Sequence, residues 1–337
     1  MEEYKNVLVS VIIPVFNVSA FLVEALDSVI YQSYSNLDII IINDGSTDGS
    51  EVICNEYALK DKRIRVIHQK NIGLSAARNV GLDLMKGDYV VFLDSDDAYH
   101  LDYIKKMMNA MQKDSVDIVI CKYINIKTNG PLKNDPIYDA LPKAISGTYD
   151  KMNALYAFVD GVIDHSVWNK LYQKKLWENV RFPLGKVYED IDTMYKLFHI
   201  CAKVCIIDET LYYRRIHSGS ITSTKSKKNF QDELSARRHF ESYIKKNIPQ
   251  LYTLEQLNRW KKSRLCCMIN FYKIVSMRKE DKLFVHDLRR QIISLEKETG
   301  LKKLWFRTKF DYYYIYLMFV INTCLRLKEN EDEDIKN

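Results

Sequence analysis

The chain has 337 residues and a formal net charge of +6, with 47% hydrophobic and 28% charged residues. This balance predicts a soluble globular protein of one large domain or two ordinary ones. The low counts of 11 Gly and 6 Pro exclude collagen-like and linker-dominated chains. Seven cysteines without a CxxC pair indicate reduced thiols in a cytosolic protein, and the short acidic start indicates no signal peptide.

The first third of the chain alternates between short β-branched runs and segments with the apolar spacing of a helix. Strands are expected at residues 7–15, 37–42, 64–68, 89–93 and 117–121, and helices at 20–30, 50–59, 74–85 and 101–112. This rhythm predicts an α/β fold with a mainly parallel sheet covered by helices on both faces. Ligands bind such sheets beyond the carboxyl ends of the strands.

Polar clusters follow the first, second and fourth expected strands, and should share one edge of the sheet. They are Pro14–Asn17, Asn43–Asp48 and Asp94–Asp97. Three carboxylates in the last cluster would repel one another unless a cation lay there, and hard oxygen ligands suit Mg²⁺ or Mn²⁺. A solvated turn that caps the next helix is an equal alternative for that cluster alone.

Charge divides the chain unevenly. Residues 1–224 carry a net −4, residues 225–328 a net +14, and the tail a net −4. We expect a domain boundary near 222–230 and a helical, basic second domain with a different partner. Its positive charges are scattered and no nucleic-acid-binding motif is present, so nucleic acid is not the expected partner.

Near the end of the chain, Tyr312–Leu325 is almost continuously apolar. Fourteen residues are too few to span a bilayer as a helix, which needs about 20. Basic residues flank this run, so we expect residues 301–328 to lie on an anionic membrane surface. A core helix or a homodimer contact is the alternative.

Four motifs in order, SVIIPVFN, IIINDGSTDGS, NIGLSAARNVGL and GDYVVFLDSDD, resemble those of glycosyltransferase family 2, which has the GT-A fold. The resemblance covers roughly residues 8–220 and is nearest to bacterial enzymes that build capsular and other surface polysaccharides. It implies a GT-A nucleotide-sugar-binding and catalytic domain over 1–225, followed by a helical domain over 226–337.

The resemblance assigns roles to matching residues. Phe16 would stack on the base of the nucleotide, and Asp44 would hydrogen-bond that base, which is usually uracil in this family. Asp94 would contact the ribose. The full set expected at the nucleotide-sugar is Pro14, Phe16, Asn17, Asp44, Arg78, Asp94, Ser95 and Lys170, and the metal set is Asp96, Asp97 and His217. Phe16 replaces the commoner Tyr, and Asn43 replaces the common first Asp of the family's DDGS form.

The second half resembles the family's later motifs. Asp190, in the segment YEDID, matches the general base that takes the proton of the acceptor hydroxyl, and Glu189 would orient it. Acidic residues at a helix start are the alternative reading of this segment. Trp168 is expected to offer a flat face to an acceptor sugar, with a core position as the alternative, and Lys170 to meet phosphate as a point charge.

Together these residues predict an inverting, metal-dependent transferase. It would move a hexose or N-acetylhexosamine from a UDP-sugar to a glycan hydroxyl, on a lipid-linked acceptor at the cytoplasmic face of the membrane. A nucleotidyltransferase would show a Gly-rich phosphate loop after the first strand, and PVFN is not one. A non-catalytic glycan- or lipid-binding protein is disfavoured because the expected acidic residues are all present.

Overall fold

The computed structural model describes residues 7–128, 138–141, 145–217, 219–220, 226–277 and 282–299. Contacts divide the chain into two compact units, Met1–Tyr252 and Thr253–Asn337. Helix α7 (Lys227–Asn247) belongs to the first unit, because it packs on α6 (Ile191–Ile200). The division therefore falls after α7, whereas the sequence placed it before this helix.

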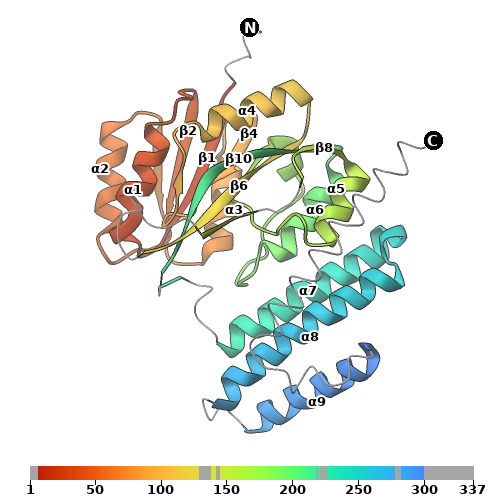
Figure 1. The fold of residues 1–337 in the computed structure, drawn as a ribbon. Helices are drawn as coiled ribbons and strands as arrows, with labels where there is room; N and C mark the ends of the chain where they lie inside the picture. Colours follow the sequence, from red (N-terminus) through yellow and green to blue (C-terminus); the bar gives the residue numbers. More distant parts are fainter. Residues whose placement is uncertain are drawn as a thin grey trace, which may run out of the picture. The chain divides into compact units, whose positions relative to one another are not determined.

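Within the described residues of the first unit, ten strands form one sheet whose main path runs β3-β2-β1-β4-β9-β6-β10-β5. Figure 1 labels β1, β2, β4, β6 and β10 of this path. The strands on that path, in chain order, are β1 Val9–Val15, β2 Leu37–Asn43, β3 Ile64–His68, β4 Tyr89–Phe92, β5 Ala98–Tyr99, β6 Ile118–Lys127, β9 Lys170–Gln173 and β10 Lys203–Ile216. Two further strands flank it, because β7 (Tyr138–Leu141) pairs with β6 and β8 (Gly147–Asp150) pairs with β10.

The sheet is parallel in its first half and mixed in its second. Strands β1 to β4 pair in parallel. Strand β9 runs antiparallel between β4 and β6, and β5 runs antiparallel to β10. The expectation of a mainly parallel sheet thus holds for the first four strands. Residues 122–150, beyond the last strand expected from the sequence, contain most of β6 and the strands β7 and β8.

Helices connect and cover these strands. In the first unit they are α1 Ser19–Ile30, α2 Ser50–Lys60, α3 Leu74–Leu84, α4 Tyr103–Asp114, α5 Lys151–Val159, α6 and α7, with short 3₁₀ turns at Lys174–Trp177 and Pro249–Leu251. All seven residues of β1 and of β2 are buried, so side chains pointing to either face of the sheet are covered there. Such double burial is why both strands read as continuous apolar runs.

The second unit is described by helices α8 (Leu254–Met277) and α9 (Lys282–Thr299), which pack on each other. The helical character expected there is confirmed for these residues. The segment 301–328, with its apolar run Tyr312–Leu325, lies outside the described residues. No helix of the described chain combines the length and apolarity needed to cross a bilayer.

Candidate active site

The turn after β4, Asp94–Asp97, divides its carboxylates between two directions. We call it the acidic turn. Asp94 and Asp96 keep about a quarter of their side chains exposed, at 27% and 25%. Asp97 is buried and accepts hydrogen bonds from the Tyr212 hydroxyl at 2.7 Å and from the backbone N–H of Arg215 at 2.7 Å. Asp97 therefore ties β10 to the acidic turn.

Asp97 was expected to help bind a metal, and the structure gives it another place. Both of its carboxylate oxygens are taken by donors on β10. Burial and the neighbouring Asp96 and Asp94 raise the pKa of Asp97 well above the usual range. With both oxygens engaged by β10, Asp97 is placed to hold the acidic turn, and its expected help in metal binding stays a prediction.

Arg78, on α3, joins the acidic turn to the segment that carries the expected base. It is 2% exposed, and its guanidinium donates to Asp94 at 2.7 Å and to Glu189. Burial alone would lower the pKa of Arg78, but the charges of Asp94 and Glu189 outweigh it and raise that pKa. A buried, permanently charged fork between two carboxylates fixes residues that lie 95 positions apart in the chain.

Asp190 lies at the N-terminus of α6, next to this bridge. It is partly exposed, and its carboxylate accepts the Ile191 N–H at 2.8 Å. Burial and the neighbouring Glu189 carboxylate raise the pKa of Asp190 to about 7, against the opposing effect of Arg78. A carboxylate with such a pKa is a far better proton acceptor at neutral pH than an ordinary aspartate.

The loops after β1 and β2 are stitched together at the same edge of the sheet. Asn17, with φ of +52°, donates its backbone N–H to Ser46 Oγ at 3.1 Å, and its side chain accepts from Thr47 N–H at 2.8 Å. Asp48 accepts the backbone N–H of Ser19 at 2.8 Å, so a side chain from the neighbouring loop caps α1. Phe16 precedes Asn17 and is 48% exposed, free to stack on a planar group.

Asp44 holds the start of the β3–α3 connection. Its Oδ1 accepts from Gln69 Nε2 at 2.7 Å and from Ile72 N–H at 3.0 Å, and its Oδ2 accepts from Gly73 N–H at 2.8 Å. Gly73 adopts a φ of +96°, a conformation that favours glycine. Asn43 turns away from this group and contacts His68 Nδ1 at 3.0 Å.

His217, just after β10, meets Asp96 at the acidic turn. Its Nε2 lies 2.9 Å from Asp96 Oδ2, while Nδ1 accepts the backbone N–H of Gly219 at 3.2 Å. Because Nδ1 is an acceptor, the proton belongs on Nε2, facing Asp96. The His217 ring also packs against Phe21, with centroids 4.6 Å apart. Asp96 and His217 are thus brought together as the sequence predicted.

The donor set fits a metal that relies on its substrate for further ligands. Among the described residues, no group of three or more His, Cys, Asp or Glu side chains is arranged to hold a metal alone. Mg²⁺ binds proteins through one or two carboxylates and takes its remaining ligands from water and substrate phosphates. Asp96 with His217 meets that requirement, and an incoming ion would replace the hydrogen between them.

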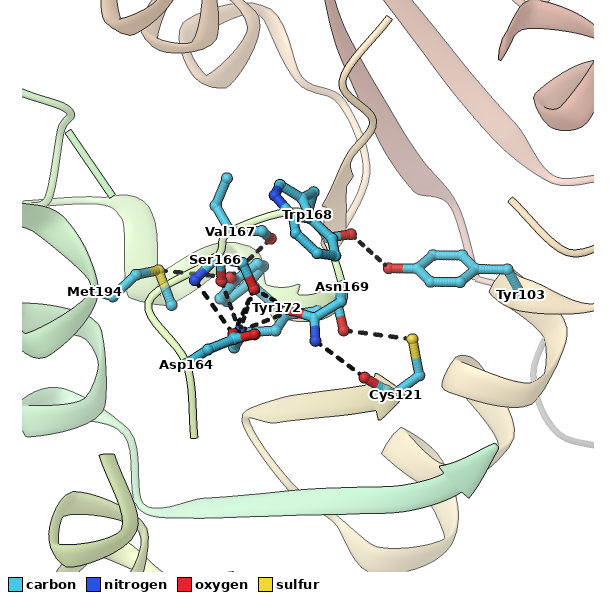
Figure 2. A network of polar contacts seen from close by, with 10 residues as sticks. Tyr103, Cys121, Asp164, Ser166, Val167, Trp168, Asn169, Tyr172 and Met194 are labelled. Atoms are coloured by element: carbon cyan, nitrogen blue, oxygen red, sulfur yellow. Dashed lines mark hydrogen bonds and ion pairs between the residues drawn. The ribbon is translucent and has the colours of Figure 1, made fainter. Parts of the chain in front are cut away.

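Lys170 is placed in the core and not at a phosphate. Its side chain is 0% exposed, and its ammonium donates to Ser166 O at 2.6 Å, Asn169 Oδ1 at 2.8 Å and Asp164 Oδ1 at 3.0 Å. Figure 2 shows Asp164, Ser166 and Asn169 gathered in this network. Since an ammonium has three protons, none is left for a phosphate, and the expected role of Lys170 is corrected to holding the 164–169 segment.

Trp168 is also largely enclosed. It is 8% exposed, stacks on Tyr212 with centroids 4.4 Å apart and meets Tyr123 edge-on at 4.5 Å. Its backbone carbonyl accepts the Tyr103 hydroxyl at 3.1 Å (Figure 2). Little of the ring remains for a sugar, so the core alternative fits Trp168 better than the acceptor role.

Sequence reasoning missed several residues that organise this site. Gln69 on Asp44, Phe182 under the Arg78 guanidinium at 5.4 Å, and Glu24 on Arg215 at 2.6 Å lie outside the recognised motifs. Each acts across a sequence distance that no local pattern encodes. Pro14 and Ser95, expected at the nucleotide, are buried within β1 and the acidic turn, where they shape the backbone.

Comparison with known proteins agrees with this arrangement. Residues 10–138 match the domain described as Glycosyl transferase family 2. The chain is 36% identical over 230 residues to glycosyltransferase GlyA of Streptococcus pneumoniae, across 65% of this chain and 32% of GlyA. It is 32% identical to GlyG of the same organism, across 65% of this chain and 74% of GlyG.

Solved structures share the fold at lower identity. S. aureus TarS 1-349 in complex with UDP-GlcNAc superposes with a TM-score of 0.58 at 17% identity, over 89% of this chain and 93% of that chain. A Pyrobaculum calidifontis mannosyltransferase in complex with GDP-Man and Mn²⁺ gives 0.57 at 15% identity, over 94% and 86%. The chain is an enzyme of the GT-A fold and belongs to glycosyltransferase family 2.

Proposed function

We propose that this glycosyltransferase moves a hexose or N-acetylhexosamine from a UDP-sugar to a glycan hydroxyl in one displacement that inverts the anomeric carbon. The observation that carries the proposal is Asp190, a partly exposed carboxylate with a raised pKa, linked through Glu189 and Arg78 to Asp94 of the acidic turn. A base linked in this way to the donor site suits direct attack of the acceptor hydroxyl on the anomeric carbon of the donor sugar.

Asp190 would remove the acceptor proton as the hydroxyl oxygen attacks. An acceptor hydroxyl is far too weak an acid to ionise beforehand, so the proton must leave during attack. Attack on the face opposite the leaving diphosphate forms the new C–O bond as the old one breaks, and the configuration inverts. No protein nucleophile is needed, and Glu189 stays paired with Arg78 to orient the base.

Asp96 and His217 would hold a divalent cation, Mn²⁺ or Mg²⁺, together with the donor diphosphate. When bound, it would neutralise the charge that develops on the leaving nucleoside diphosphate. The protein contributes the pairing of Asp96 with His217 and the fixed backbone of the acidic turn, which Asp97 and Arg215 hold in place. The metal dependence is part of the proposal.

The hydrogen bonds of Asp44 favour uracil over guanine. A carboxylate offers about four lone pairs, and Gln69, Ile72 and Gly73 already use three of them. The remaining lone pair, on Oδ2, suits the single imino donor of uracil. Guanine presents two parallel donors and would need one lone pair on each oxygen. Since GT-A neighbours bind UDP-GlcNAc in one case and GDP-Man in another, this count is the argument for a UDP-sugar.

The acceptor side of the proposal rests on charge. Residues 225–328 carry a net +14, which suits a cytoplasmic enzyme lying on an anionic membrane and acting on lipid-linked glycans of a bacterial surface polysaccharide. Each basic residue near such a surface contributes about 1 kcal/mol. Flotation with anionic vesicles, lost at high salt and lost on removal of residues 301–337, would support this; no flotation at low salt would contradict it.

The central test is a screen of nucleotide-sugars for transfer and for slow hydrolysis, read as released nucleoside diphosphate. UDP-hexoses or UDP-N-acetylhexosamines should be turned over, and an α-linked donor should give a β-linked product by NMR coupling constants. A retained configuration would exclude the single displacement. Binding of UDP-sugars without turnover of any donor or acceptor would favour the non-catalytic alternative.

A further inference from the structure

Helix α7 makes polar contacts on both sides of the Glu189–Asp190 pair, which we call the dyad. Asp232, 6% exposed on α7, accepts from Lys186 Nζ at 3.0 Å and from the Val187 backbone N–H at 3.4 Å, just before the dyad. About two turns further along α7, His239 Nδ1 lies 2.8 Å from the carboxylate of Asp192, just after the dyad.

The segment before the dyad needs an external hold. Gly185 and Tyr188 both adopt left-handed backbone conformations, with φ of +68° and +63°. For a bulky side chain such as tyrosine this is a strained conformation, which persists when the surroundings impose it. Asp232 fixes the two residues between them, so it is placed to impose that bend and the direction in which the dyad leaves it.

The segment after the dyad is held from the same helix. Asp192 is buried in the first turn of α6 and also accepts the Tyr195 hydroxyl at 2.8 Å. Around it, Tyr195 packs on Phe240 and Tyr243 of α7, with centroids 5.4 and 4.8 Å apart. These contacts set the position of the α6 N-terminus, which carries Asp190.

We propose that α7 belongs to the catalytic apparatus: Asp232 and His239 are positioning residues that hold the dyad from its two ends, through Lys186 and Val187 on one side and Asp192 on the other. The inference rests on the proposed function, because Asp190 is taken as the base. A helix that the charge pattern assigns to a separate basic domain thereby helps to set the geometry of proton removal.

The test uses the full-length chain with Asp232→Asn, Asp232→Ala and His239→Gln. A displacement of the base by about 1 Å costs up to about 100-fold in rate. We therefore expect kcat to fall about 10-fold in single variants and more in Asp232→Ala combined with His239→Gln. The UDP dissociation constant, measured by calorimetry, should stay within about twofold, because the nucleotide contacts lie on other loops.

Two controls lie on the same helix. Glu233→Gln breaks an ion pair with Arg237 within α7, and Arg238→Gln changes an exposed residue next to His239. Both should keep wild-type kcat. A second measurement separates positioning from general weakening: in an Asp190→Asn background, Asp232→Asn should lower kcat no further, because the group it positions is already disabled.

The outcomes separate the two claims. Wild-type turnover of Asp190→Asn would overturn the proposed base and leave α7 nothing to position. An inactive Asp190→Asn together with Asp232→Asn and His239→Gln variants that match the two controls would overturn the role of α7 alone. An additive loss of kcat in the Asp190→Asn background, with a lowered melting temperature, would make the α7 contacts merely structural.

Discussion

The two sides of the candidate active site are built differently. On the donor side, the loops after β1 and β2 come from one run of the chain and contact each other directly, as Asn17 does with Ser46 and Thr47, while the acidic turn after β4 is held by β10. On the acceptor side, the dyad is held by residues from distant segments, Arg78 on α3 and Asp232 and His239 on α7. The proposed donor side thus rests mainly on one βα edge with support from β10, whereas the proposed base is held entirely by long-range packing.

The largest expected effect is on the acceptor side. Asp190→Asn keeps the shape of the side chain but removes the proton acceptor, so kcat should fall by roughly 10²–10⁴. Donor affinity should stay nearly unchanged, because Asp190 lies apart from the loops after β1 and β2. Steady-state kinetics with calorimetric UDP binding measures both. A loss of donor affinity as large as the loss of kcat would contradict the proposed separation of the donor side from the acceptor side.

On the donor side we expect a smaller loss of turnover, accompanied by a loss of donor affinity. Asp96→Ala removes one of the two candidate metal ligands, so turnover should fall by about 10²–10³, the cost of losing one stabilising contact to the leaving group. Here the apparent metal and donor affinities should weaken together. Titration of Mn²⁺ and Mg²⁺ into the apoenzyme provides the measurement, and full activity in excess EDTA would contradict metal dependence.

Arg78, which bridges Asp94 and Glu189, should affect the pH dependence of kcat. Asp190 must be ionised to accept a proton, and its pKa is about 7, so kcat should rise as pH increases through that value. Arg78 lowers the pKa of Asp190 by its charge. In Arg78→Gln the acid limb should therefore move to higher pH, and in Arg78→Lys it should move less. An unchanged limb in both variants would show that the bridge does not act on the base.

Breaking the buried ion pair between Arg78 and Glu189 should also lower the free energy of unfolding. Removing one partner of a buried ion pair leaves uncompensated charge and typically costs about 3–5 kcal/mol. Chemical unfolding of Arg78→Gln at pH 8 is the appropriate check, since the carboxylates it leaves behind are then ionised. Equal stability of the variant and the wild type would mean that solvent replaces the guanidinium without cost.

The smallest effect concerns nucleotide choice. Gln69→Ala frees one lone pair on Asp44 Oδ1, in addition to the one already open on Oδ2. The carboxylate could then accept both donors of guanine. We expect GDP to compete with the UDP-sugar about 3- to 10-fold better than in the wild type, within the range of one ordinary hydrogen bond. Competition assays with UDP and GDP measure the ratio. An unchanged ratio would remove Asp44 as the determinant.

The strands of the proposed donor edge, and the polar turns that follow them, can be predicted from local sequence pattern. Buried strands read as apolar runs, and their polar ends therefore stand out, so β1 to β4 and the residues that follow them were placed from local pattern alone. The pairing of Asp96 with His217 was expected from family motifs, and the free thiols expected from cysteine spacing are found at the six cysteines of the described region.

The proposed acceptor side depends on contacts that no local sequence pattern encodes. A lysine and a tryptophan in a motif give no sign of their burial, which depends on what packs around them, and Lys170 and Trp168 proved to be enclosed. Asp97 looks like its neighbours in sequence, yet its contacts with β10 take both of its oxygens. Helix α7 carries the basic composition of the second domain but packs on α6, where Phe240 on its buried face contacts Tyr195. The residue type sets which interactions a side chain can form. Long-range contacts decide which partners it forms them with.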